Sequence, residues 1–236
     1  MQSDYVPQPI ACFDVLDVAA ELPTDVVLDN MWKAGFPATD VSKTLMAALL
    51  PTATALLKPQ SIGRLYEAAA LHPASRQRLP EPIRSADYLL FAVATAGRSV
   101  DDEAARLRSN GDLVNSMVLD AIALTALCEA TAHLMAAVRD WARSRTLGIS
   151  RAVAPGSGGD RWDLPNQDLL FAHVPAGEIG VELTPAFWML PTKSTSFALG
   201  MGRDIQDVKD PFSCMGCPRL DCPYRHDSSE EMITIT

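Results

Sequence analysis

Residues 114–141 read VNSMVLDAIALTALCEATAHLMAAVRDW and form the most apolar stretch of the chain. A membrane span needs about 18 or more apolar residues with few charges. Here the stretch is interrupted by Asp120, Glu129, His133, Arg139 and Asp140. Apolar residues recur every three or four positions, which predicts one long, alanine-rich core helix. The predicted buried stripe, with Cys128 as a small core residue, comprises Met117, Val118, Ala121, Leu124, Cys128, Thr131, Leu134, Val138 and Trp141.

Strands and another helix are expected on both sides of this long helix. Residues 87–96 read DYLLFAVATA and stop at Gly97, which predicts a buried strand ended by a glycine turn. Ser99 is then expected to cap a helix with acidic residues in its first turn. Residues 178–184 alternate like a half-buried strand, and residues 194–201 are expected to form another.

The first third of the chain has weaker patterns. Residues 40–57 are expected to be helical, with a break near Pro51. Residues 72–82 contain three prolines and little apolar periodicity, so we expect a connector. Helical and strand-rich regions are therefore separated along the chain, which is typical of α+β proteins.

Three cysteines lie within nine residues near the C-terminus, at Cys214, Cys217 and Cys222. The spacing C-x2-C-x4-C lets three thiolates converge on one ion or cluster, so a metal site is favoured over a disulfide with one loose thiol. Zinc would be completed by His226 in a Cys3His set. A 4Fe-4S cluster also takes cysteine thiolates, and its fourth ligand would be Cys12, Cys128, His226, a partner residue or solvent.

Composition limits the possible partners. The chain has 236 residues and 48% hydrophobic content, which is enough to bury a sizeable core. Its net charge of −9 disfavours a nucleic-acid surface and favours a protein partner. The N-terminus MQSDY has neither a basic nor an apolar signal region, so a cytoplasmic location is expected.

The glycine-rich loop after the long helix is a candidate binding loop. Residues 151–167 contain three glycines and two prolines, and Arg151 and Arg161 are suited to hold a carboxylate or phosphate. The pattern is neither a Walker motif nor a dinucleotide fingerprint. An ordinary surface loop is the alternative interpretation.

The order of these features resembles the activation domain of cobalamin-dependent methionine synthase. The family reads approximately R-x-x-x-G-Y and then I-G-x-x-L-T-x-S-F-x-M-x-P-x-x-S-V-S-G. The resemblance covers residues 87–202, about half of the chain. Standalone relatives of the domain also end in C-x2-C-x4-C-x2-R. The matching positions here are Thr95, Gly97, Asp120, Glu129, Arg151, Gly156, Gln167, Ile179, Gly180, Leu183, Thr184, Phe187, Met189, Pro191, Ser194, Ser196, Cys214, Cys217, Cys222 and Arg225.

The resemblance implies that this domain binds S-adenosylmethionine and docks on a cobalamin-binding domain. Arg151 corresponds to the family arginine that contacts the ligand carboxylate, and Gly156 would give backbone access. Glu129, Pro155 and Thr184 are the other cofactor-binding positions that it implies. The chain departs from the family where Ser157 replaces a tyrosine, where two residues are inserted before Trp162, and where the cysteine region replaces two late tyrosines.

Three functions follow as hypotheses. The favoured one is an accessory protein that reactivates or loads the cobalamin of a separate corrinoid methyltransferase, because the homocysteine, folate and cobalamin modules do not fit in this length. The alternatives are a non-catalytic interaction module with a structural zinc and a vestigial pocket, and a methyltransferase acting on a small substrate. The resemblance implies a twisted, mainly antiparallel sheet with packed helices. The expected regions are a helical accessory part (1–84), an activation-domain-like core (85–203), a cysteine-rich segment (204–226) and a tail (227–236).

Overall fold

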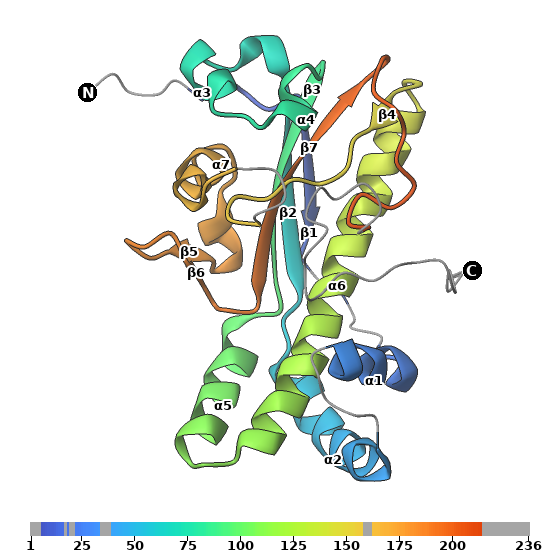
Figure 1. The fold of residues 1–236 in the computed structure, drawn as a ribbon, viewed down its shortest axis with the longest axis vertical. Helices are drawn as coiled ribbons and strands as arrows, with labels where there is room; N and C mark the ends of the chain where they lie inside the picture. Colours follow the sequence, from blue (N-terminus) through green and yellow to red (C-terminus); the bar gives the residue numbers. More distant parts are fainter. Residues whose placement is uncertain (1–5, 17, 19–21, 34–38, 158–161, 214–236) are drawn as a thin grey trace.

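A five-stranded antiparallel sheet carries the fold of the computed structural model, which describes residues 6–16, 18, 22–33, 39–157 and 162–213 (Figure 1). Its strand order is β1-β2-β3-β7-β4, and every neighbouring pair is antiparallel. The strands are β1 (Ala11–Val15), β2 (Gln60–Glu67), β3 (Tyr88–Thr95), β4 (Gly148–Ile149) and β7 (Ser194–Gly202), and a separate hairpin pairs β5 (Glu182–Leu183) with β6 (Met189–Leu190).

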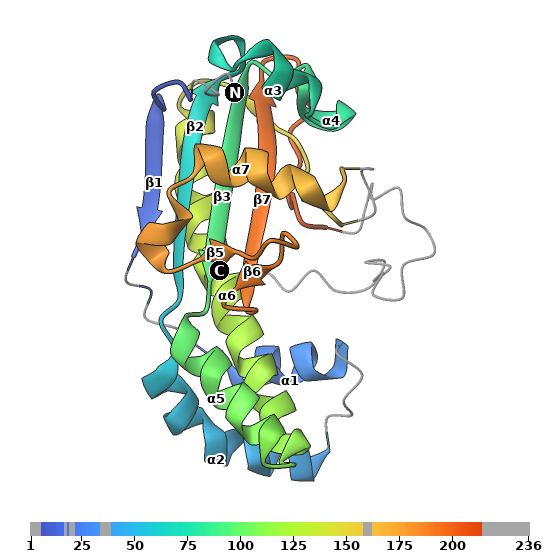
Figure 2. The same ribbon diagram turned by 90° about the vertical axis from the view of Figure 1, so that its left-hand side faces the viewer.

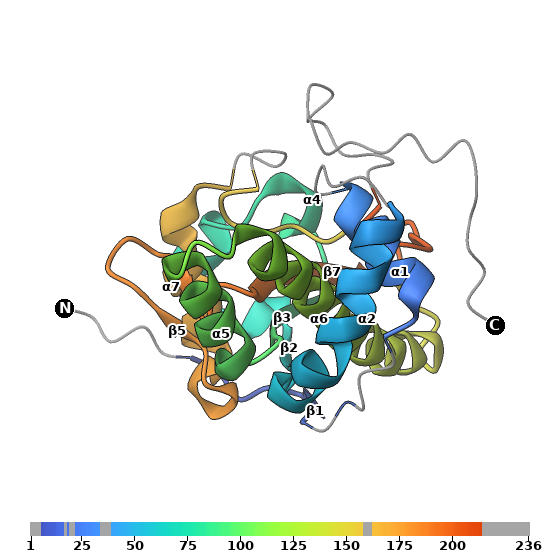
Figure 3. The same ribbon diagram turned by 90° about the horizontal axis from the view of Figure 1, so that it is seen from below.

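Helices cover both faces of the sheet and extend it at one end (Figures 2 and 3). The long helix α6 crosses one face, and α7 lies on the other face with the β5–β6 hairpin. The α-helices are α1 (Thr24–Lys33), α2 (Asp40–Leu56), α3 (Pro73–Gln77), α4 (Glu81–Arg84), α5 (Arg98–Ser109), α6 (Leu113–Arg143) and α7 (Gln167–His173), and the 3-10 turns are η1 (Ala68–Ala70), η2 (Leu164–Asn166) and η3 (Ala176–Ile179).

Strands β3 and β7 match the sequence prediction. β3 is buried along nearly its whole length and pairs with β7 in an eight-residue register from Tyr88–Met201 to Thr95–Ser194. Its side chains alternate between the two faces, with Leu90 packed in the core on the α6 side and Phe91 in the core on the α7 side. Apolar residues on both faces explain why this strand was visible in the sequence.

The long helix α6 is a core helix, as its periodicity predicted. It begins after Asp112, whose carboxylate accepts a hydrogen bond from the Asn115 amide at 3.3 Å. It is long and apolar enough to pass for a membrane span, but its most apolar window is 61% buried inside the fold. Its first half packs with α1, α2 and α5, and its second half packs on the sheet.

The predicted buried stripe of α6 is wrong at three positions. Met117 is 40% exposed, Leu124 is 38% exposed, and Cys128 is exposed as well. Neighbouring residues such as Ile122 and Ala126 are fully buried instead. Periodicity reports that a helix has an apolar face, but it cannot tell which neighbours will cover each end of that face. Thr131 is buried as predicted, and its hydroxyl donates to the Leu127 carbonyl at 2.9 Å.

Two helix signals in the sequence were misjudged. Helix α2 continues through Pro51, which is exposed, because buried Met46 and Ala53 hold the helix to its neighbours on either side. Helix α5 is capped at Gly97 rather than Ser99. Gly97 adopts a φ of 100°, and its amide donates to the Thr95 hydroxyl at 3.1 Å.

Three segments also differ from the expected pattern. Residues 178–184 contain only the short strand β5, because η3 ends at Gly180 in a left-handed conformation with φ of 71°. Residues 72–82 hold the short helices α3 and α4 rather than a plain connector. β1 and β2 were not predicted from the sequence. Both join the same sheet as β3, so one sheet spans the boundary placed after residue 84.

Residues 214–236 lie outside the described part of the chain.

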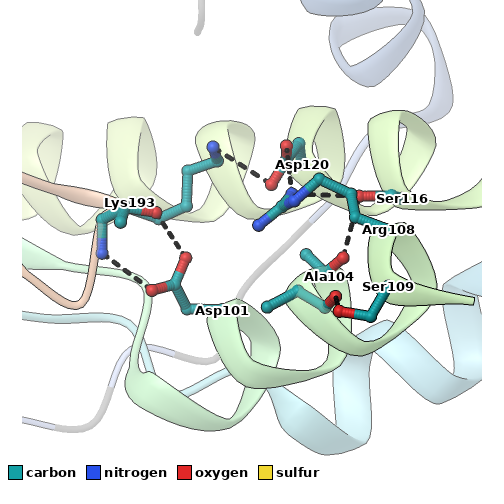
Figure 4. A network of polar contacts seen from close by, with 9 residues as sticks. Asp101, Ala104, Arg108, Ser109, Ser116, Asp120 and Lys193 are labelled. Carbon is teal, nitrogen blue, oxygen red and sulfur yellow. Dashed lines mark hydrogen bonds and ion pairs between the residues drawn. The ribbon is translucent and has the colours of Figure 1, made fainter. Parts of the chain in front are cut away.

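A polar network ties the helical end of the molecule to the sheet (Figure 4). The Asp101 carboxylate accepts hydrogen bonds from the Thr192 amide, at 2.9 Å, and from the Thr192 hydroxyl. The Lys193 ammonium lies 3.0 Å from Asp120, which also pairs with Arg108 at 3.3 Å. These contacts join α5 and α6 to the segment that leads into β7.

Gly148 is expected to be essential for stability. A Cβ atom at this position would lie 1.9 Å from the backbone carbonyl oxygen of Ile205, and backbone cannot move aside as a flexible side chain does. Gly148→Ala should therefore lower the free energy of unfolding by about 1–3 kcal/mol or more, the usual cost of overpacking. Urea denaturation measures this change. Gly177→Ala is the matched control, since no atom lies within 4 Å of the position that a Cβ would take there, and equal stability of the two variants would contradict the prediction.

Candidate functional site

A cavity of about 630 Å³ lies between α6 and residues 209–212. Its volume is in the range that holds small-molecule ligands and cofactors, and its walls are mostly apolar. The lining residues are Leu124, Leu127, Cys128, Thr131, Ala132, Met135, Ala136, Arg139, Thr195, Lys209, Asp210, Pro211 and Phe212. The cavity therefore has one wall from the long helix, one from the segment after β7, and a contribution from β7 itself.

The helix wall includes three residues of the predicted buried stripe, namely Leu124, Cys128 and Thr131. Leu124, Cys128 and Met135 are separated by four and seven positions, so they share one face of α6. Leu124 and Cys128 are exposed on this face. The apolar stripe of α6 thus continues from the core into the cavity.

The opposite wall is held in place by Arg139 of α6. The Arg139 guanidinium donates to the carbonyl of Val208 at 2.9 Å and to that of Lys209, and it lies 4.0 Å from the Asp207 carboxylate. The ring of Phe212 packs edge-on against Phe197 of β7, with centroids 4.9 Å apart. Arg139 is a charged residue within an apolar helix, and this was the one feature of the sequence that pointed to the wall. Its partners could not be predicted, because they lie about 70 residues away in the chain.

Arg151 belongs to the extended segment 150–153, which is bonded both to β7 and to Pro211 of the cavity wall. Ser150 and Gly200 exchange two hydrogen bonds of 2.9 Å, and Val153 forms a bridge with Ala198, so the segment follows the outer edge of β7. The Ala152 amide donates to the Pro211 carbonyl at 2.8 Å. Arg151 is half-buried, and it precedes Ala152, whose hydrogen bond to Pro211 holds the outer wall of the cavity in place.

The glycine loop is closed on itself near Trp162. Gly156 has a φ of 80°, and its amide donates to the Trp162 carbonyl at 2.7 Å. The positive φ favours glycine at this position, and a Cβ there would also lie 2.9 Å from the end of the Leu164 side chain. Pro155 is buried beside it. Within the described part of the chain, the buried indole nitrogen of Trp162 has no hydrogen-bond partner. Arg161 lies outside the described residues.

Glu129 and Thr184 lie on opposite sides of the sheet. Glu129 is half-buried on α6, next to Cys128. Thr184 follows β5 in the hairpin on the α7 side (Figure 1), where its hydroxyl accepts a hydrogen bond from the Trp188 amide at 3.1 Å. Glu129 follows the cavity residue Cys128 in sequence, and Arg151 precedes Ala152, which is bonded to the cavity residue Pro211, but neither side chain lines the cavity, and Thr184 lies apart from it. The ligand roles of Glu129, Arg151, Pro155, Gly156 and Thr184 stay a prediction.

A polar cluster is buried on the α7 face of the sheet. The Ser196 hydroxyl donates to the Gln167 side-chain carbonyl at 2.8 Å, and the Tyr66 hydroxyl donates to the His173 carbonyl at 2.7 Å. Burial raises the pKa of Tyr66 to about 12, so its hydroxyl stays a donor at neutral pH. His173 packs against the rings of Tyr66 and Phe91.

The two described cysteines lie far apart in the fold. Cys12 is on the edge strand β1, beside Phe13, which packs in the core on the α6 side, so Cys12 points to the other face. Cys128 lines the cavity on α6. Among the described residues there is no group of three or more metal-binding side chains. The predicted ligands Cys214, Cys217, Cys222 and His226 lie outside them.

Comparisons with known proteins support the fold. No protein-family model matches the chain, and no curated protein matches it either. Among solved structures, a crystal structure of the MetH reactivation domain bound to AdoHcy is similar, with a TM-score of 0.58 and 14% sequence identity. The match covers 89% of this chain and 84% of that chain. The α+β reactivation-domain fold that the sequence predicted is therefore confirmed.

Proposed function

We propose that this chain is a cytoplasmic accessory protein for a corrinoid-dependent methyltransferase. The observation that carries the proposal is the reactivation-domain fold over 89% of the chain. In the proposed role the chain docks on a corrinoid protein whose cobalamin has reached the inactive cob(II) state. One electron from an external reductant would reduce cob(II) to cob(I), and transfer of the methyl group from S-adenosylmethionine, which would leave as S-adenosylhomocysteine, would restore methylcobalamin.

The cavity beside α6 supports binding of S-adenosylmethionine. The similar reactivation domain was solved with AdoHcy, which is S-adenosylmethionine without its transferable methyl group. The cavity volume of about 630 Å³ suits a ligand of this size. Its apolar walls would receive the uncharged parts of the ligand, and the guanidinium of Arg151 would pair with the carboxylate.

The position of Ser213 supports a metal site on the same side of the molecule. Ser213 is the last described residue, and it follows the Pro211–Phe212 wall of the cavity. Cys214 comes next in the sequence, and Cys128 lines the facing wall. Cys128 is therefore a better fourth ligand than Cys12, which lies on the opposite face and at the far edge of the sheet. Four thiolates suit a 4Fe-4S cluster, which would supply single electrons when bound.

The alternative function is an interaction module with a structural zinc site. Ser157, exposed where the resembled family has a tyrosine, favours it because a ligand contact is lost there. Zinc has no redox chemistry and would need only His226 to complete a Cys3His set. Metal identity therefore separates the two functions.

The first prediction from this proposal concerns the cysteines. Cys217→Ser should remove most of the bound metal, because thiolate ligands act as a set. Cys128→Ala should lower the iron content and change the electron paramagnetic resonance spectrum, because one iron loses its protein ligand. Elemental analysis and that spectrum on anaerobically purified protein measure both effects.

Cys12→Ala is the matched control and should leave the iron content and the spectrum unchanged. A native protein with no iron would defeat the cluster altogether. A native protein with iron whose spectrum is the same in Cys128→Ala would remove Cys128 from the ligand set and leave the cluster in place.

The second prediction concerns the ligand. Arg151→Ala should weaken binding of S-adenosylmethionine by about 2–4 kcal/mol, the range for losing a charged partner at a buried site. Isothermal titration calorimetry measures the affinity, and Arg143→Ala, an exposed arginine elsewhere, should bind as the native chain does. Absence of binding to the native chain would favour the vestigial pocket.

A reactivation assay tests the function itself. The protein, a reductant and S-adenosylmethionine are mixed with a corrinoid protein of the same organism held in the cob(II) state. The visible spectrum should change to that of cob(I)alamin or methylcobalamin at a rate that depends on this chain and fails with Cys217→Ser. If neither the chain nor S-adenosylmethionine changes the rate with any corrinoid protein tested, the interaction module becomes the better proposal.

A further inference from the structure

A second cavity, of about 770 Å³, opens at the end of the sheet farthest from α1 and α2 (Figure 1). It lies where β2, β3 and β7 approach the C-terminal end of α6. Its lining residues are Glu67, Ala68, Ala69, Arg76, Ser85, Ala86, Asp87, Tyr88, Arg145, Leu147 and Arg203. It shares no residue with the cavity beside α6.

Three arginines from distant parts of the chain meet in this cavity, although the chain as a whole carries a net charge of −9. Arg76 comes from α3, Arg145 follows α6, and Arg203 follows β7. In the described part of the chain, the side chains of Arg76 and Arg203 make neither an ion pair nor a hydrogen bond. Other arginines do pair with acids, as Arg78 does with Asp168 and Arg106 with Glu103.

Arg145 is held in a defined orientation at the cavity wall. Its guanidinium carbon lies 4.1 Å from the centroid of the Trp141 ring, over the ring face. Its Nη1 donates to the Ser144 hydroxyl at 2.8 Å and to the Trp141 carbonyl at 3.3 Å. The Tyr88 ring packs edge-on against the same tryptophan, with centroids 5.5 Å apart. Stacking therefore fixes one cation of the cavity before any ligand arrives.

The two acids of the lining do not neutralise these cations. Glu67 and Asp87 are both exposed, and neither forms an ion pair with an arginine of the cavity within the described residues. The Asp87 carboxylate accepts a hydrogen bond from the backbone amide of Arg203 at 3.3 Å, so it serves the backbone rather than the guanidinium. Three cations against two anions leave the cavity net positive.

We propose that this cavity binds a small phosphate-bearing molecule with at least two anionic groups. Guanidinium groups present paired N–H donors that match phosphate oxygens, and three of them around one cavity suit a ligand with more than one anionic group. The volume of about 770 Å³ leaves room for an attached organic part beside Ala68, Ala69 and Leu147. The site does not depend on the proposed corrinoid function.

Calorimetric titration of the full chain with pyrophosphate tests the site, with sodium chloride holding the ionic strength constant. Native protein should bind pyrophosphate saturably. Arg76→Gln and Arg203→Gln should each weaken binding about tenfold or more, the loss expected for a hydrogen bond between charged groups. Because the Arg203 side chain is exposed and has no ion pair or hydrogen bond to the other described residues, Arg203→Gln should keep the native melting temperature.

Arg143→Gln is the matched control, since it removes the same charge from an exposed position on α6 outside the cavity. It should keep the native affinity within about twofold, because an exposed charge that does not line the cavity is screened by solvent and salt. Absence of saturable binding to the native chain would overturn the proposal. An equal loss in Arg143→Gln would overturn it as well, because the binding would then follow net charge and not this cavity.

Discussion

The packing of α6 across the sheet is the contact on which the rest of the structure depends. Leu134 and Val138 are fully buried between the helix and the strands, and a Cβ on Gly63 of β2 would lie 3.4 Å from the Leu134 side chain. The Ser61 hydroxyl also donates to the Ala130 carbonyl at 2.8 Å. A small residue on the strand and a shared hydrogen bond let the helix approach closely. The first half of α6 extends beyond the sheet and packs with α1, α2 and α5 in a second core.

The parts of the fold that were predictable are those whose signal is local. β3 and β7 could be predicted as apolar strands because both of their faces are buried. α6 could be predicted as a helix because its apolar residues recur regularly over a long stretch. β2 was missed because it carries Ser61, Gly63 and Arg64, which are unusual in a central strand. Arg64 is tolerated there because Asp14 of β1 and Glu178 lie within ion-pair distance. No local pattern reports partners that are 50 or more residues away.

The candidate site was predictable only in part, for the same reason. Exposed Cys128 lines the cavity, yet the sequence assigned it to the core, and the loop that begins at Arg151 reaches the cavity only through the hydrogen bond from Ala152 to Pro211. The apolar period of α6 continues past the point where another element covers it, and from there the same pattern forms a cavity wall. The far wall depends on Arg139 binding the carbonyls of Val208 and Lys209, which is a tertiary contact with no sequence signature. The arginine cavity likewise joins three segments that are distant in the chain.

The two chemical demands of the proposed function fall on the same side of the sheet. Cobalamin reactivation needs one electron and one methyl group at a single cobalt, so both must be delivered from one docking face. The ligand cavity and the segment that ends at Ser213 lie on the α6 side of the sheet, whereas the exposed hairpin around Trp188 lies on the α7 side. A corrinoid partner that receives both would therefore approach α6 near its cavity. There the walls are apolar, and Arg139, already bonded to backbone carbonyls, keeps the segment before Ser213 in place.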